Sequence, residues 1–124
     1  MSASVDGVVT KAVIAGSAVS FNCTLDESNC VNQSIEWVHY FASDNRAVIW
    51  YRGGRLNTNL IGLLQSSGVT VEEDSARGWS VLNIPSASFT RDHGRFHCVV
   101  TRLRHRCQMN FQLTVTGKIC KIKY

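Results

Sequence analysis

Asp92-His93-Gly94-Arg95-Phe96-His97-Cys98 is the most informative stretch of this 124-residue sequence. In its second half Phe96 and Cys98 occupy alternate positions, and the alternation continues to Val100. Successive side chains of a β-strand point to opposite faces, so this pattern predicts a half-buried strand. Phe96 and Cys98 are therefore expected on one buried face.

The same two-residue period recurs on both sides of this stretch, with turn signals between the apolar runs. The best-defined sets are Val19, Phe21 and Cys23; Ile35, Trp37 and His39; and Ser80, Leu82 and Ile84. Shorter strand-like runs cover 47–51, 69–71 and 111–115, and 72–78 has the composition of a polar turn. No segment carries a convincing helical stripe. About eight or nine short strands at this spacing predict an all-β antiparallel sandwich, in which one face of each strand is buried.

The composition fits one soluble-type domain. The formal net charge is +4, and one proline and nine glycines leave no stretch that resembles a linker. No apolar run approaches the roughly 20 residues of a membrane span, and no signal peptide is visible. We expect a single domain over 1–117, followed by a tail over 118–124.

Cys23, Trp37 and the Asp-x-Gly-x-Phe-x-Cys stretch together resemble the V-set domains of the immunoglobulin superfamily, in particular those of butyrophilin-like and costimulatory-ligand proteins. Cys98 follows Cys23 by 98 − 23 = 75 residues, which leaves room for the C′ and C″ strands of a variable-type domain. The resemblance implies a Greek-key sandwich with a Cys23–Cys98 disulfide against Trp37. Phe96 and Leu82 would lie in the same core.

Three features depart from the V-set pattern. Phe96 replaces the usual corner tyrosine, so its hydroxyl hydrogen bond is absent. The motif aspartate, Asp92, lacks the usual arginine at the start of the D strand, and Arg77, Arg91 or backbone groups remain as its partners. The Phe-Gly-x-Gly joining motif of antigen receptors is missing, which argues against a rearranging antibody or T-cell receptor chain.

Three further cysteines lie outside this pair. On the resemblance, Cys30 falls in the B–C loop and Cys107 in the F–G loop, at the same end of a V domain. A Cys30–Cys107 bridge would either pre-organise a binding tip or simply stabilise the two loops. Cys120 would be an interchain cysteine of a stalk or an unpaired thiol. Several disulfides indicate an oxidising, extracellular compartment.

The stretch 101–107 concentrates positive charge. Its candidate ligand-binding residues are Arg102, Arg104, His105 and Arg106. Arginine binds carboxylate and sulfate groups in a bidentate manner, so an acidic protein, an anionic glycan or a phospholipid surface are candidate partners. The alternative is a solvated loop without a ligand. Whether Arg46, Arg52 and Arg55 share this surface is left open, and nucleic acid is not expected because no aromatic platform accompanies the arginines.

The outward side of the G, F, C and C′ strands is a second candidate surface, which we call the GFCC′ face. Its expected members are Val38, Tyr40, Trp50, His97 and Val99. V-type domains pair through this face, so the resemblance implies a homodimer or heterodimer. Alternatively, neighbouring strands and loops cover these residues.

Other chemistry is weakly indicated. Asn22 and Asn32 begin glycosylation sequons. His97, His105 and Cys107 could imitate a metal site, but a Cys30–Cys107 bridge explains Cys107 better. We therefore expect no catalytic residues, no metal and no cofactor.

The leading hypothesis is a cell-surface or secreted recognition module for a protein ligand. A lectin-like domain for anionic glycans and a homophilic adhesion domain are its rivals.

Overall fold

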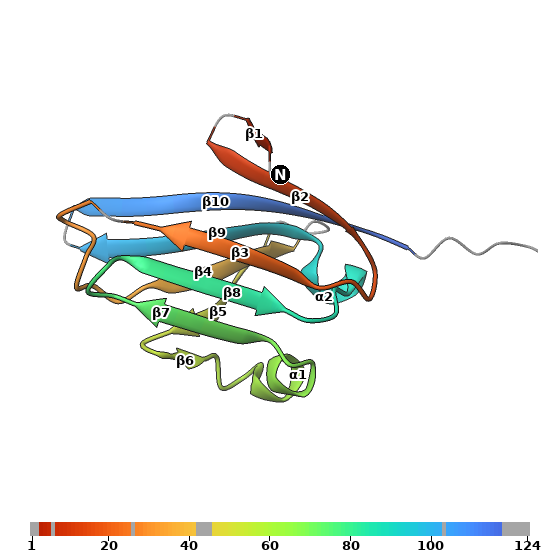
Figure 1. Ribbon diagram of the computed structural model, residues 1–124. Coiled ribbons are helices and arrows are strands. Elements are labelled where there is room, and N and C mark those ends of the chain that lie inside the picture. The colour runs from red at the N-terminus through yellow and green to blue at the C-terminus, as the bar shows by residue number, and fades with distance from the viewer. Residues whose placement is uncertain (1–2, 6, 26, 42–45, 103, 118–124) are drawn as a thin grey trace, which may run out of the picture.

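A computed structural model describes residues 3–5, 7–25, 27–41, 46–102 and 104–117. They form two facing β-sheets (Figure 1). The larger sheet has the order β1 (Ala3–Val5), β2 (Val8–Ile14), β10 (His105–Thr116), β9 (Gly94–Arg102), β4 (Glu36–Phe41), β5 (Ala47–Arg52), β6 (Arg55–Leu56). The smaller sheet has the order β3 (Val19–Thr24), β8 (Trp79–Ile84), β7 (Thr70–Asp74). The expected all-β sandwich is confirmed.

Strand pairing is antiparallel throughout these sheets except where β2 runs parallel to β10. Eight of the strands have five residues or more, whereas β1 has three and β6 has two. Most of the long strands coincide with runs singled out in the sequence, because each must bury one face against the opposite sheet. The seven-residue β2 was not predicted.

The core lies between the sheets and is rich in aromatic rings. Phe21 of the smaller sheet contacts Phe96 and Phe111 of the larger one, with ring centroids 5.2 and 4.8 Å apart. Trp37 is fully buried, and its ring centroid lies 5.6 Å from that of Phe111. Leu82 is fully buried in the same cluster. The contacts of Phe21 with Phe96 and Phe111 cross between the sheets and hold the two layers together.

The Cys23–Cys98 disulfide joins β3 to β9 across this core, with a Cα–Cα distance of 6.4 Å. Both cysteines are almost completely buried. The two cysteines are 75 residues apart in the sequence. In the chain-entropy model, a bridge that closes a loop of that many residues stabilises the fold by about 4 kcal/mol.

The sequence did not predict two short helices, α1 (Ile61–Ser66) and α2 (Phe89–Asp92). Six and four residues are too few to show a helical stripe, and within α1 it is Leu64 that is fully buried. The expected polar turn over 72–78 is also shorter, because β7 continues to Asp74 with Glu72 pointing outward. No helix in the described ranges is long and apolar enough to cross a membrane.

Candidate ligand-binding tip

One end of the sandwich gathers the connections that follow β3, β5, β7 and β9, and we call this end the tip. The backbone N–H of Leu25 donates to the carbonyl oxygen of Gly78 at 2.5 Å, and that of Asn32 donates to Ser75 at 2.6 Å. Gly78 has a φ of 72°, and a Cβ there would collide with the Leu25 carbonyl. Glycine at this position thus allows the β3 connection and the β7–β8 turn to pack together.

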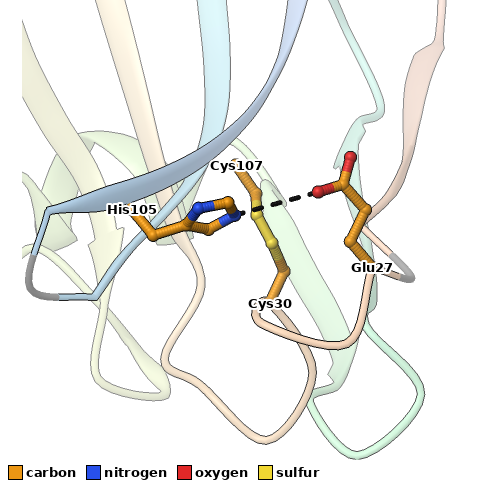
Figure 2. A group of neighbouring side chains, drawn as sticks. All are labelled: Glu27, Cys30, His105 and Cys107. Atoms are coloured by element: carbon orange, nitrogen blue, oxygen red, sulfur yellow. Dashed lines mark ion pairs between the residues drawn. A yellow bond between two sulfur atoms is a disulfide. The ribbon is translucent and has the colours of Figure 1, made fainter.

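A disulfide joins Cys30 to Cys107 at the tip, with a Cα–Cα distance of 6.2 Å. Cys30 is fully buried and Cys107 is 7% exposed. Figure 2 shows Glu27 and His105 on either side of this bridge, with Nε2 of His105 3.8 Å from Oε2 of Glu27. The loop after β3 and the start of β10 are therefore held by one covalent bond and a solvent-exposed ion pair.

The basic residues of the 101–107 stretch lie on and beside the β9–β10 turn. Arg102, Arg104, His105 and Arg106 are all exposed. A surface hollow at the tip is lined by Asn29, Arg102, Arg104 and His105. Among the described residues, no ion pair joins Arg102, Arg104 or Arg106 to a carboxylate. Three guanidinium groups of the tip are consequently available to an anionic partner.

The GFCC′ face adjoins the tip and is more polar than the sequence suggested. Tyr40 and His97 are half-buried neighbours with ring centroids 4.6 Å apart. The guanidinium carbon of Arg95 lies 5.4 Å from the centroid of Tyr40. Burial lowers the pKa of His97, and the nearby positive charges of Arg95 and Arg106 lower it further. Arg106 therefore carries the positive potential of the tip onto this face.

One expected member of the GFCC′ face, Trp50, was wrong. Trp50 is 1% exposed and points into the core, where its ring contacts His39 and Phe96 at 5.1 and 5.0 Å. Val48 pairs with the inward-facing His39, so alternation turns Trp50 inward as well.

Val99 lies outside the core cluster, yet it is only 4% exposed. Its cross-strand partners are Glu36 of β4 and Gln108 of β10. Both side chains are longer than valine, which agrees with the low exposure of Val99. Val38, Tyr40 and His97 are partly exposed and remain on this face.

The three arginines left open by the sequence separate into two groups. Nε of Arg52 lies 3.0 Å from Oε1 of Glu36, at the tip end of β4, and Arg55 pairs with Arg52 across the β5–β6 turn. Arg46 precedes Ala47, which pairs with Tyr40 toward the other end of the sheet. Arg52 and Arg55 thus lie at the tip end of the sheet, where Glu36 offsets the charge of Arg52, and Arg46 lies toward the other end.

Asp92 is paired with Arg91, one of the partners left open by the sequence. Nε and Nη2 of Arg91 lie 2.5 and 2.6 Å from the two carboxylate oxygens of Asp92. Asp92 is fully buried and also accepts a hydrogen bond from the backbone N–H of Ser88 at 2.8 Å. This network stabilises the turn into β9 and plays no part at the tip.

The remaining candidates are placed as follows. Asn22 is exposed on β3, in the smaller sheet, and Asn32 is exposed at the tip with a φ of 61°. Cys120 and the tail over 118–124 lie outside the described residues. Alternation with Phe96 could have identified Arg95 as an outward residue, but no local signal marked Glu27 or Asn29.

Comparisons with known proteins identify the fold of this chain but not its ligand. No protein-family model and no curated protein matches the chain. Among solved structures, the second Ig domain from mouse polymeric immunoglobulin receptor is similar, with a TM-score of 0.68 and 12% sequence identity. The match covers 90% of this chain and 99% of that chain. The protein described here has an immunoglobulin-type fold; at this identity the likeness extends to the fold alone.

Proposed function

We propose that this chain is an extracellular recognition domain of the variable type, which binds an acidic surface of a protein ligand through its basic tip and the adjoining GFCC′ face. The variable-type assignment is supported by β5 and β6, which extend the larger sheet beyond β4 as C′ and C″ strands do. Two disulfides within one small domain support an oxidising, extracellular compartment.

The observation that carries the proposal is the combination of rigidity and uncompensated charge at the tip. The Cys30–Cys107 bridge fixes the segment from which Arg102, Arg104 and Arg106 project. A pre-organised loop loses less conformational entropy when it binds. Positive charge without an ion-pair partner among the described residues favours association with an acidic surface and disfavours basic ones.

Charge also argues against homodimerisation through the GFCC′ face. A two-fold interface brings the same patch of both copies together. Arg95 and Arg106 both lie close enough to His97 to lower its pKa, so a two-fold interface centred on this face would bring the positive patch against its own copy. A heterologous acidic partner avoids this repulsion.

An anionic glycan is the second candidate ligand. The hollow lined by Asn29, Arg102, Arg104 and His105 offers an amide and two guanidinium groups, which suit sulfate or carboxylate groups of a sugar. The basic surface that continues to Arg106 and Arg95 on the GFCC′ face extends beyond this hollow, which favours the larger contact area of a protein.

Binding of the biotinylated full chain to intact cells tests both candidates. Arg102→Glu should weaken binding at least tenfold, about 1.4 kcal/mol. Arg46→Glu makes the same charge change away from the tip and should leave binding unchanged. Protease treatment of the cells should abolish binding, whereas heparinase and sialidase should not.

Loss of binding after glycosidase treatment, but not after proteolysis, would transfer the proposal to the glycan. Equal binding by Arg102→Glu and the unaltered chain would overturn both.

A further inference from the structure

Four side chains with metal-binding atoms converge at the tip: Glu27, Cys30, His105 and Cys107. One oxygen, one nitrogen and two sulfur atoms all lie within 4.8 Å of one another. They come from two chain segments, one before β4 and one at the start of β10. Figure 2 shows the imidazole and the carboxylate directed toward each other beside the sulfur pair.

We propose that reduction of the Cys30–Cys107 disulfide converts this cluster into a zinc site. Two thiolates, one imidazole and one carboxylate are ligands that zinc binds in tetrahedral sites. Zinc bonds of about 2.0 to 2.3 Å place tetrahedral ligand atoms about 3.3 to 3.8 Å apart. Starting from separations of at most 4.8 Å, the oxygen and nitrogen atoms need to approach by about an ångström. The two sulfur atoms, about 2 Å apart in any disulfide, need to separate by a little under 2 Å once their bond is reduced.

The chemistry balances with a dithiol reductant. The dithiol reduces the Cys30–Cys107 bond, is itself oxidised to a disulfide, and passes two hydrogen atoms to the cysteine sulfurs. Zinc then displaces the two thiol protons, which are released to solvent. Two thiolates and the Glu27 carboxylate carry three negative charges, so the zinc complex retains one, close to the guanidinium groups of Arg102 and Arg104.

The zinc ion would keep the same two segments joined after the covalent bond is lost. Cys23–Cys98 is expected to survive mild reduction, because both of its cysteines are at most 1% exposed whereas Cys107 is 7% exposed. The described geometry thus supports a tip that is cross-linked by sulfur when oxidised and by zinc when reduced.

Cobalt(II) titration of the full chain tests the proposal, in a Cys120→Ser background that removes the fifth cysteine. Mass spectrometry with thiol alkylation first establishes that a phosphine reductant has opened Cys30–Cys107 alone. The reduced chain should bind one cobalt ion with the visible absorption of a tetrahedral site and a thiolate-to-cobalt charge-transfer band. Zinc should displace the cobalt, and the oxidised chain should show neither band.

Variants distinguish a four-ligand zinc site from non-specific binding of the metal by the two thiols alone. Glu27→Gln and His105→Ala should each weaken zinc binding to the reduced chain at least tenfold, whereas Glu72→Gln, an exposed acidic residue of β7, should leave it unchanged. Circular dichroism checks that each variant is folded. Absence of the cobalt bands in the folded, reduced chain, or unchanged affinity in both ligand variants, would overturn the proposal. Cell binding by the oxidised chain is independent of these outcomes.

Discussion

The indole Nε1 of Trp37 donates a hydrogen bond to the hydroxyl oxygen of Ser80, 2.9 Å away, inside the sandwich. Trp37 belongs to the larger sheet and Ser80 to the smaller one, and both are fully buried. The Ser80 hydroxyl in turn donates to the carbonyl oxygen of Glu72 at 2.9 Å. A polar chain thus crosses the core next to the aromatic cluster and satisfies the one polar atom of the tryptophan.

Ser80→Ala should destabilise the fold by about 1 to 3 kcal/mol, because it leaves the buried indole N–H without an acceptor. Urea denaturation with both disulfides intact measures the loss. In a Trp37→Phe background, which lacks the donor, the same change should cost less. Equal losses in the two backgrounds would show that the hydrogen bond contributes nothing.

The free energy of unfolding should fall between pH 6.5 and pH 4 because of His39. This side chain is fully buried, and its Nε2 donates to the carbonyl oxygen of Asp92 at 3.1 Å. Burial lowers the pKa of His39 from 6.5 to about 4. In that interval the unfolded chain binds a proton that the folded chain excludes, so the contribution is complete above pH 6.5 and lost as the pH drops to 4.

The size of this effect is about 3 kcal/mol for a change in pKa of that order. Chemical denaturation at a series of pH values measures it. His39→Leu should give a curve with a shallower slope over the same interval, because no group at this position titrates. Parallel curves for the two proteins would contradict the assignment.

Asp92→Asn should cost about 3 to 5 kcal/mol, since it leaves Arg91 charged in a buried position. Arg91 is 9% exposed, and its guanidinium binds both carboxylate oxygens. Asp74→Asn is the matched control, because its partner Arg77 is 81% exposed and surface pairs contribute about 0 to 1 kcal/mol. Chemical denaturation measures both losses. Equal decreases in the denaturation midpoint for the two variants would contradict this prediction.

Removal of the tip disulfide should leave a folded but less stable domain. With Cys23–Cys98 in place, the second bridge closes segments of 30 − 23 = 7 and 107 − 98 = 9 residues. A loop of about 16 residues corresponds to about 3 kcal/mol in the chain-entropy model. Cys30→Ala with Cys107→Ala should therefore lower the unfolding free energy by about this amount and weaken ligand binding through increased mobility of the tip.

Differential scanning calorimetry and cell binding by the same protein separate these two effects. Weakened stability with unchanged binding would assign the bridge to loop stabilisation alone. Unchanged stability would show that the ion pair of Glu27 with His105 and the surrounding packing already hold the two segments.

The sequence by itself determined the layers of this protein. Alternation at Phe21, Trp37 and Phe96 assigns inward faces because the strand period is two and each sheet has one buried side. The resemblance carried by Cys23, Trp37 and the 92–98 stretch then implies the immunoglobulin arrangement, and the structure has it. Even the basic character of the β9–β10 turn can be read directly from 101–107.

Only the tertiary structure decided which of these residues meet. The register of β5 against β4 turned Trp50 inward, and the turn before β9 gave Asp92 its neighbour Arg91 as partner. Packing of the loop after β3 brought Glu27 to His105. Local periodicity fixes the face on which a side chain lies, whereas contacts between segments distant in the chain depend on strand register and loop path, which are set by the packing of the whole domain.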